Sequence, residues 1–365
     1  MLKMFNYKKS DVALFNDVVD GIVDSARQSI EGVQNRKEYE EMQDVVCENL
    51  VKYCVSNTRY ENRFEAEGLD LIKNPAVNGS RDFRENFDAV IAQVINATLP
   101  MTMSSRFADT FMELHHVGWG DTARFIVDSN ELYQVNELAE GIHRGALQHI
   151  YNNEISVNPQ PVEIAVSIDW YLLASRKFDI GVWAAKIARS FENYVLAKAI
   201  ASLLSVTDGL GAGYTTNGVD VKKFGTLAQR VSAANNGAAV YALGTSVALA
   251  SLMPNTVGLQ YGLGVEITKN GFLDRYLGTN VIAIDQAIDP STLNSTANLM
   301  VPDDKIFLIA AGAYKPLKVV MEGNEITLTD IPEYTSDRTY VFSVKVRLGI
   351  KAVLGSKHGV INLGG

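Results

Sequence analysis

The chain has 365 residues, a formal net charge of −9, 47% hydrophobic residues and two cysteines. This composition supplies enough apolar residues for one large domain or for two or three smaller ones, and it excludes intrinsic disorder and a disulfide scaffold. The acidic balance argues against sequence-specific recognition of nucleic acid, which needs a concentrated basic surface.

The first hundred residues show helical periodicity. Apolar residues recur at three- and four-residue steps over residues 10–57, which predicts helices there. A second such segment covers residues 82–98, and Pro100 follows its predicted end. Between these segments, residues 58–80 are polar and rich in turn-forming residues, so a loop is expected.

The character of the sequence changes at Thr122. Residues 123–128 are strand-like, a polar stretch follows, and residues 161–170 are predicted to form the returning strand. A hairpin of this kind is marginal in water and needs further strands or a helix for support. We therefore expect its support to come from elsewhere, for example from another chain.

Residues 180–205 form the clearest predicted helix, with large apolar residues at four-residue steps. At about 1.5 Å per residue this helix is close to 40 Å long. Beyond a glycine-rich segment, residues 222–315 mix the two kinds of element, as in an α/β or α+β domain. Helices are predicted over residues 224–235 and 245–253, and strands over 238–243, 281–284 and 306–309.

Two strand signals close the sequence. Gly323-Asn324 lies between residues 317–321 and 325–328, which predicts a β-hairpin. Residues 338–348 alternate between apolar and polar side chains, which predicts one long strand.

No motif for catalysis or for membrane insertion stands out. The glycine-rich segment 209–213 follows a helix rather than a strand, which is not the setting of a phosphate-binding loop. Pro254 and several asparagines and glycines interrupt the uncharged stretch 231–265 before about 20 apolar residues are reached. We therefore expect no enzymatic activity, no cofactor, no metal and no membrane association. Cys47 and Cys54 are expected to be buried neighbours in the reduced state.

The order of these segments resembles the major capsid protein of tailed bacteriophages, which has the Hong Kong 97-like fold. The stretches that carry the resemblance are Val166–Phe178, which leads into the long helix, Ile306–Tyr314 and Tyr340–Gly349. The likeness covers residues 105–365 by architecture rather than by a short motif, and residues 1–105 match it less well.

The resemblance implies an α+β fold with four regions. These are a mainly helical N-terminal arm (1–105), an extended β-hairpin loop (122–168), a peripheral domain with the spine helix 180–205 (106–121, 169–221 and 316–365) and an axial α/β domain (222–315).

The implied function is that of a major capsid protein. It would self-assemble as hexamers and pentamers into an icosahedral or prolate shell around phage double-stranded DNA, and it would be assembled in the host bacterial cytoplasm and reside in the virion. Its partners would be further copies, the portal, and scaffolding or decoration proteins, with DNA in non-specific proximity. The alternative is an encapsulin-type nanocompartment shell that holds a cargo enzyme. A soluble enzyme with an unrecognised site is a third hypothesis.

Site residues follow from the same resemblance. Candidates for inter-subunit contact are Arg124, Phe125, Tyr133, Arg144, His149 and Tyr151. Candidates that face the genome are Lys186, Arg189 and Lys198, for which a solvated helix face is the alternative. Some members of the family form an isopeptide crosslink through a lysine of the extended loop. This sequence has no lysine between Lys73 and Lys177, so we expect a shell held without covalent bonds.

Overall fold

The computed structural model describes all residues except 1–8, 33–34, 103–110, 119, 128–132, 134, 136–146, 150–152, 176, 208–212, 253–270, 290–291, 293–297, 312–314, 331–338, 353–356 and 365. The chain forms two compact units. Unit 1 contains Met1–Ser104, Pro161–Glu192 and Asn324–Arg347, and unit 2 contains Ser105–Gln160, Asn193–Gly323 and Leu348–Gly365. Four elements have residues in both units, namely α8 (Ile180–Thr207), β10 (Leu317–Asp330), β11 (Thr339–Ala352) and, by its first residue, β4 (Gln160–Asp169).

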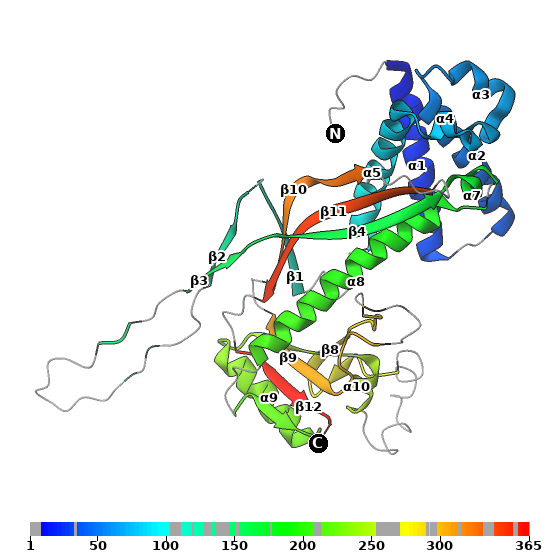
Figure 1. Ribbon diagram of the computed structural model, residues 1–365. Coiled ribbons are helices and arrows are strands. Elements are labelled where there is room, and N and C mark those ends of the chain that lie inside the picture. Colours follow the sequence, from blue (N-terminus) through cyan, green and yellow to red (C-terminus); the bar gives the residue numbers. More distant parts are fainter. Residues whose placement is uncertain are drawn as a thin grey trace, which may run out of the picture. The chain divides into compact units, whose positions relative to one another are not determined.

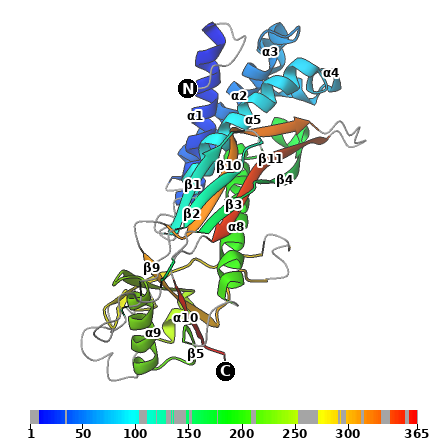
Figure 2. The same cartoon turned by 90° about the vertical axis from the view of Figure 1, so that its left-hand side faces the viewer.

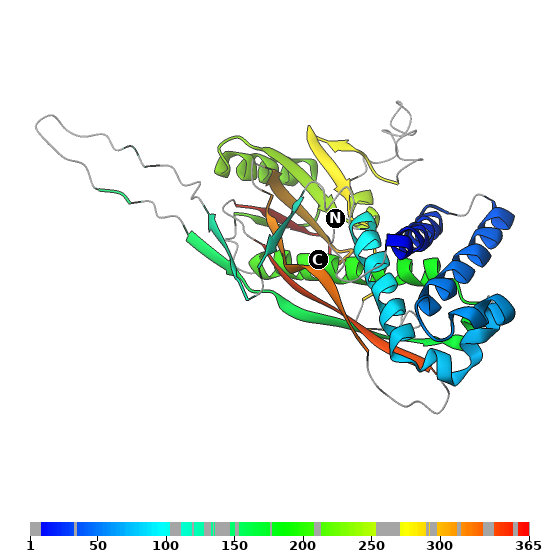
Figure 3. The same ribbon diagram turned by 90° about the horizontal axis from the view of Figure 1, so that it is seen from above.

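Unit 1 contains three long helices that lie side by side (Figure 2, Figure 3). They are α1 (Lys9–Glu31), α2 (Arg36–Val55) and α5 (Arg81–Thr102). The apolar residues that repeat at three- and four-residue steps face one another, because this spacing places them on one side of a helix. The fully buried ones include Ile22, Leu50, Val90, Ile91 and Val94. The two helical segments predicted at the N-terminus are thus confirmed.

The end of α5 differs from the prediction, because Pro100 lies inside the last turn of the helix rather than after it. A proline in a helix removes one backbone hydrogen bond, and near the end of a helix few such bonds remain to be lost. In the same region, Thr98 donates its hydroxyl proton to the carbonyl oxygens of Val94 and Ile95, at 2.9 and 3.3 Å.

The loop predicted over residues 58–80 is wrong, because this segment forms three short helical elements. These are α3 (Glu61–Glu67), the 3₁₀ helix η1 (Gly68–Lys73) and α4 (Pro75–Asn78). The side chain of Asn74 accepts a hydrogen bond from the backbone N–H of Ala76 at 3.0 Å and caps α4. Four apolar residues of this otherwise polar segment are buried, Leu69, Leu71, Ile72 and Val77.

A four-stranded sheet has the order β1-β10-β11-β4 (Figure 1). It contains β1 (Met112–Val117) and β4 (Gln160–Asp169) at its edges. β1 and β10 run parallel, from Met112 opposite Leu317 to Val117 opposite Glu322. The hairpin predicted at Gly323-Asn324 is wrong, because β10 continues through both residues. β1 pairs with β10 only as far as Glu322, so β11 is the strand that neighbours β10 beyond this point, and pairing within a sheet overrides a local turn preference.

A separate two-stranded sheet pairs β2 (Ala123–Val127) with β3 (Asn153–Val157). The returning strand was predicted at 161–170, but those residues form β4 of the four-stranded sheet. Pro159 lies between β3 and β4. Proline has no backbone N–H and cannot extend a ladder, so β3 ends before it and a new strand begins after it.

Unit 2 contains a six-stranded sheet of order β5-β12-β9-β6-β8-β7. Its strands are β5 (Thr215–Asn217), β6 (Ala239–Gly244), β7 (Arg275–Tyr276), β8 (Thr279–Ala283), β9 (Lys305–Ala311) and β12 (Gly359–Asn362). Two helices, α9 (Val221–Ala234) and α10 (Ser246–Ala250), share a buried apolar cluster with it. A side chain at Gly359 would meet Leu227 and Val231 at 3.0–3.1 Å, so α9 needs glycine there. The five elements predicted in 222–315 are all present.

The long predicted helix is confirmed as α8, which follows the short helix α7 (Trp170–Ala174). The Trp170 ring contacts Phe83 and Phe87 edge-on, with ring centroids 5.5 and 5.1 Å apart. The structure as a whole is mixed helix and sheet, so the predicted α+β class is confirmed. Among the described residues, none of the helices is both long and apolar enough to cross a membrane.

Candidate assembly surfaces

The β2–β3 hairpin has two unlike faces. In its antiparallel register Ala123 lies opposite Val157 and Phe125 opposite Ile155, and alternate residues point to the same side of a sheet. Ala123 and Val157 form a buried cluster with Val320 of β10. The base of the hairpin is therefore supported by β10 of its own chain, and support of the rest of the loop by another chain stays a prediction.

A buried charge lies beneath this base. The Lys318 ammonium group contacts the Glu113 carboxylate, and only 6% of the Lys318 side chain is exposed. The ammonium also lies 5.5 Å from the centre of the Phe125 ring, and the His115 ring meets Phe125 edge-on at 4.8 Å. The hydrogen bond from Lys318 holds the pKa of Glu113 below its usual value. A buried lysine is costly without a partner, so Glu113 is the group that makes this arrangement stable.

The other face of the hairpin and the residues beyond it leave large apolar side chains in solvent. Ile126 is 75% exposed, Val135 is 94% exposed and Leu147 is 75% exposed. Tyr133, a predicted contact residue, is 65% exposed. Single exposed apolar residues are common, but four within 22 residues of one loop are typical of a surface that another molecule covers.

The other predicted contact residues lie as follows. Arg124 is exposed on β2 and forms an ion pair with Glu154 of β3 at 3.4 Å. The Phe125 ring is half-buried against its own chain, and His149 is exposed. Arg144 and Tyr151 lie outside the described residues.

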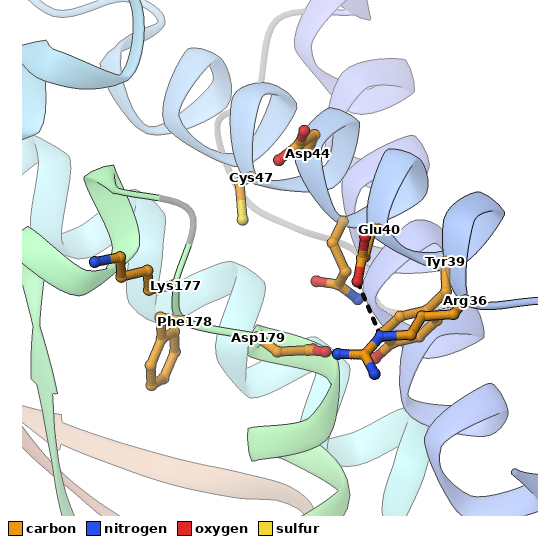
Figure 4. Close-up of a pocket in the computed structure, with 9 residues that line it drawn as sticks. Arg36, Tyr39, Glu40, Asp44, Cys47, Lys177, Phe178 and Asp179 are labelled. Atoms are coloured by element: carbon orange, nitrogen blue, oxygen red, sulfur yellow. Dashed lines mark hydrogen bonds and ion pairs between the residues drawn. The ribbon is translucent and has the colours of Figure 1, made fainter. Parts of the chain in front are cut away.

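A second candidate region joins the N-terminal helices to the start of α8 within unit 1 (Figure 4). The Tyr39 hydroxyl donates a hydrogen bond to Asp179 Oδ2 at 2.6 Å, and Asp179 Oδ1 accepts one from the backbone N–H of Val182 at 2.9 Å. Burial and this carboxylate raise the pKa of Tyr39 to about 12, so the hydroxyl remains a donor. Asp179 thus caps α8 and anchors it to α2 at once.

Close packing fixes the same junction. A side chain at Gly181 would meet Ser25 Oγ of α1 at 2.0 Å, so α1 and the first turn of α8 approach more closely than any larger residue allows. Ser25 Oγ also lies 3.2 Å from the Tyr39 hydroxyl oxygen, and Gln43 donates a hydrogen bond to Ser25. The N-terminal helices therefore position the beginning of the long helix.

A cavity of about 800 Å³ lies beside this network. Its lining mixes cations, Arg36 and Lys177, with the carboxylates of Glu40, Asp44 and Asp179, as Figure 4 shows. Arg36 pairs with Glu40 at 3.0 Å. Glu40 is engaged by Arg36, and Asp179 by Tyr39 and the first turn of α8, so we assign these residues a structural role.

Both cysteines are free and buried, as predicted. Cys47 lies at the wall of the cavity described above, with 2% of its surface exposed. Burial raises the pKa of the Cys54 thiol well above its ordinary value. A protonated, enclosed thiol is a poor nucleophile, which agrees with a packing role.

The three candidate cations of α8 have different surroundings. Lys186 is exposed. Arg189 is exposed too, but its guanidinium lies 3.4 Å from the Ile30 carbonyl oxygen, at the C-terminal end of α1. A cation is favourable there because carbonyl oxygens at a helix end carry partial negative charge. The Lys198 ammonium lies 5.6 Å from the centre of the Tyr194 ring. Within the described part of the chain, no group of three or more histidine, cysteine or acidic residues is placed to hold a metal ion.

The features described here are an exposed apolar surface, a buried ion pair and the anchor of a long helix. The model of one protein family, described as "SPbeta prophage-derived putative capsid protein YonB", matches residues 13–362. The chain belongs to this family and is a capsid protein. With the observed order of elements, this confirms the resemblance to phage capsid proteins with the Hong Kong 97-like fold.

Solved structures similar to the chain include shell proteins at 13% sequence identity. A virus-like particle from Pyrococcus furiosus has a TM-score of 0.44, with 76% of this chain and 99% of that chain covered. The capsid of cyanophage P-SCSP1u has a TM-score of 0.46, with 70% and 87% covered. The holo-SrpI encapsulin complex from Synechococcus elongatus PCC 7942 has a TM-score of 0.42, with 72% and 88% covered. No curated protein matches the chain. The family assignment therefore rests on the family model.

The sequence analysis missed two parts of these surfaces. Ile126 occupies an outward position of β2, where alternation favours a polar residue, and this local break in the pattern is a readable signal. The pair of Glu113 and Lys318 joins residues 205 positions apart, and no local pattern connects them.

Proposed function

We propose that the chain is the major subunit of a phage head, which assembles as hexamers and pentamers into a closed shell around double-stranded DNA. The proposal deepens the family assignment, because a capsid protein must present surfaces that bind further copies of itself. In such a shell each contact is weak, and each subunit is held at several places at once.

The observation that carries the proposal is the exposed apolar set on the extended loop, Ile126, Tyr133, Val135 and Leu147. Their exposed area is a cost in a monomer and a source of free energy when a neighbour covers it, at about 25 cal/mol per Å². We therefore assign the loop to the contact between neighbouring subunits. Arg124, Arg144, His149 and Tyr151 are proposed to lie in the same contact.

Assembly of purified protein tests this assignment. The wild-type chain is expected to form particles that sediment rapidly and show five- and six-fold clusters by cryo-electron microscopy. Ile126→Glu places a charge in the proposed contact and is expected to leave a folded protein that does not assemble. Ile126→Val is the matched control and is expected to assemble. Normal particles from Ile126→Glu would contradict the role of the loop.

The contents of native particles separate a phage head from an encapsulin-type shell. Double-stranded DNA together with portal and tail proteins is expected for a head. A single cargo enzyme without a genome would contradict the phage head and support the encapsulin-type nanocompartment instead. A denaturing gel of the same particles tests the covalent state, and a single band at the mass of one chain is expected because residues 74–176 contain no lysine.

We propose further that the regions of the chain have the roles of a capsid subunit. Residues 1–105 serve as the arm, 122–168 as the extended loop, 180–205 as the spine helix and 222–315 as the axial domain.

We also propose that three cations of α8 contribute to the inner wall near DNA, namely Lys186, Arg189 and Lys198. Arg189 has a structural partner at Ile30, which makes it the weakest of the three DNA candidates. Such contacts are non-specific and depend on salt. Substitution of Lys186 and Lys198 by glutamine is expected to change DNA retention at high salt and to leave shell geometry unchanged.

A further inference from the structure

An exposed leucine occupies a strained backbone position in unit 2. Leu277 and Gly278 form the two-residue turn that joins β7 to β8. Both residues have positive φ, +48° for Leu277 and +79° for Gly278, as in a type I′ turn. Asparagine, aspartate and glycine are preferred at such positions, because a larger side chain crowds the backbone there. In the described part of the chain, the other non-glycine residues with positive φ are both asparagines, Asn57 and Asn236.

Packing within the chain explains how the turn is held, but it leaves much of the leucine side chain in solvent. The Phe224 ring of α9 contacts Tyr276, the residue before the turn, edge-on with ring centroids 4.9 Å apart. Leu277 itself is 54% exposed. A strained residue persists where its surroundings fix it, and such positions cluster at functional sites. The side chain of Leu277 is therefore a candidate for contact with another molecule.

A second exposed apolar residue lies near Leu277, on α9. A Cβ atom at Gly225 would lie 3.8 Å from Leu277 Cδ1, which places this side of α9 beside the turn. Val221 is on the same side of α9, about one helical turn before Gly225, and is 57% exposed. Leu277 and Val221 together are called the turn patch.

Charges of opposite sign border the turn patch. Arg275, an exposed residue of β7, donates a hydrogen bond from its Nε to Asn280 Oδ1 at 2.8 Å. Asp220 is exposed and directly precedes Val221. Burial and, after it, the Asp220 carboxylate raise the pKa of Tyr276, so this negative charge lies close to the turn. A surface with an apolar centre, one cation and one carboxylate can match a copy of itself, with the cation of one copy against the carboxylate of the other.

We propose that the turn patch binds a second copy of this chain, with Arg275 of one copy near Asp220 of the other. The proposal rests on the proposed function, because a shell subunit must bind further copies of itself. It adds a contact on unit 2 to the contact assigned to the extended loop. Leu277 is the anchor of this contact. The strain at Leu277 is a cost to the free chain, and coverage of its side chain by the second copy offsets that cost.

Leu277→Asn tests the anchor by two measurements on the full chain. The substitution relieves strain, so the unassembled variant is expected to unfold at the same urea concentration as the wild type or at a higher one. The protein concentration needed for assembly is expected to rise about tenfold, because an apolar anchor is lost. Val247→Asn is the matched control, at a 67% exposed position of α10 outside the turn patch, and is expected to assemble like the wild type.

Two results of this experiment would overturn the proposal. Unfolding of Leu277→Asn at a clearly lower urea concentration would show that Leu277 serves packing against α9. Unchanged assembly of Leu277→Asn beside a wild type that forms particles would show that the turn patch is not a contact, and the proposed function would stand. A wild type that forms no particles would overturn the proposed function and this contact together.

Charge exchange identifies the partner. Arg275→Asp alone or Asp220→Lys alone is expected to raise the concentration needed for assembly about tenfold, because like charges then meet across the contact. The two substitutions together are expected to restore assembly, since the cation and the carboxylate have only exchanged places. Circular dichroism checks that each variant is folded. Single variants that assemble normally, or a double variant without rescue, would overturn the contact between two copies.

Discussion

In the helical part of unit 1, Ile22, Leu50 and Val94 are fully buried, whereas beyond the base of the β2–β3 hairpin Ile126 and Val135 stand almost fully in solvent. The helices α1, α2 and α5 bury their apolar residues among themselves. The hairpin buries a small cluster at its base and leaves the rest of its apolar surface open. The difference shows that the helices are stabilised by their own packing, whereas the loop has apolar surface that packing within its own chain leaves exposed.

The largest effect is expected in the helical core. Phe87→Ala removes a fully buried ring that packs edge-on against Trp170 at 5.1 Å. A large-to-small change of this kind costs about 3–5 kcal/mol, because the transfer of the ring is lost and a cavity is left. Urea unfolding of the unassembled chain measures it. A cost below about 1 kcal/mol would mean that the helical region does not depend on its own core, and the comparison would break.

The next effect concerns the anchor of α8. Tyr39→Phe removes the hydroxyl that donates to Asp179 and leaves one carboxylate oxygen without that donor. We expect a loss of about 1–3 kcal/mol in the free energy of unfolding, as for hydrogen bonds to charged groups. Hydrogen exchange in the first turn of α8 should rise as well.

The matched control for this change lies in the other region. Tyr133 is exposed, so Tyr133→Phe is expected to leave the free energy of unfolding unchanged within about 0.5 kcal/mol. Equal losses from the two tyrosines would show that the loop is packed as firmly as the helices.

A smaller effect depends on pH and lies beneath the hairpin. The pKa of Glu113 is lowered in the folded chain, mainly by the hydrogen bond from Lys318. The stabilisation is therefore present above the ordinary carboxyl pKa of about 4.3 and is lost as the pH falls through the lowered value. Because Glu113 is 38% exposed, solvent screening limits the expected contribution to about 1 kcal/mol or less.

Urea titrations between pH 7 and pH 3 measure this contribution. The difference between wild type and Glu113→Gln is expected to shrink towards zero at the acid end. A difference that stays constant over this range would remove Glu113 as the source of the pH dependence.

The smallest effect on stability is expected at the exposed face of the hairpin. Ile126→Glu should change the free energy of unfolding by no more than about 0.5 kcal/mol, because the side chain already lies in solvent. The large effect of this substitution is expected on assembly. A loss of several kcal/mol in the unassembled chain would show that Ile126 packs within its own subunit and would erase the contrast with Phe87.

The sequence predicted the elements that depend on local periodicity. The long helix and three strands of the six-stranded sheet, β6, β8 and β9, follow from their spacing of apolar residues, whereas β5, β7 and β12 were not predicted. α8 extends only two residues beyond its predicted end. The wrong predictions concern segments whose structure depends on residues far away in the sequence. Gly323-Asn324 resembles a turn locally, but β10 continues past the end of β1, with β11 as its neighbour in the sheet. Likewise β2 pairs with β3 rather than β4, since Pro159 ends the ladder.

The candidate site was less accessible to prediction. Tyr133 and Arg124 are exposed and stay predicted contact residues, whereas the Phe125 ring lies against Lys318, far away in the sequence. Asp179 was not singled out in the sequence, and its bond to Tyr39 joins residues 140 positions apart. Contacts of this range depend on the fold as a whole.

The parallel pairing of β1 with β10 has a consequence for biosynthesis. The strand that completes the base of the hairpin contains Val320, so a ribosome must translate most of the message before Ala123 and Val157 acquire their packing partner. The helices α1, α2 and α5 leave the ribosome long before that, and contacts that are local in the sequence form quickly. The helical part of a nascent chain is thus able to fold while the base of the hairpin still lacks its packing partner Val320. The base of the hairpin becomes packed only after Val320 has been synthesised.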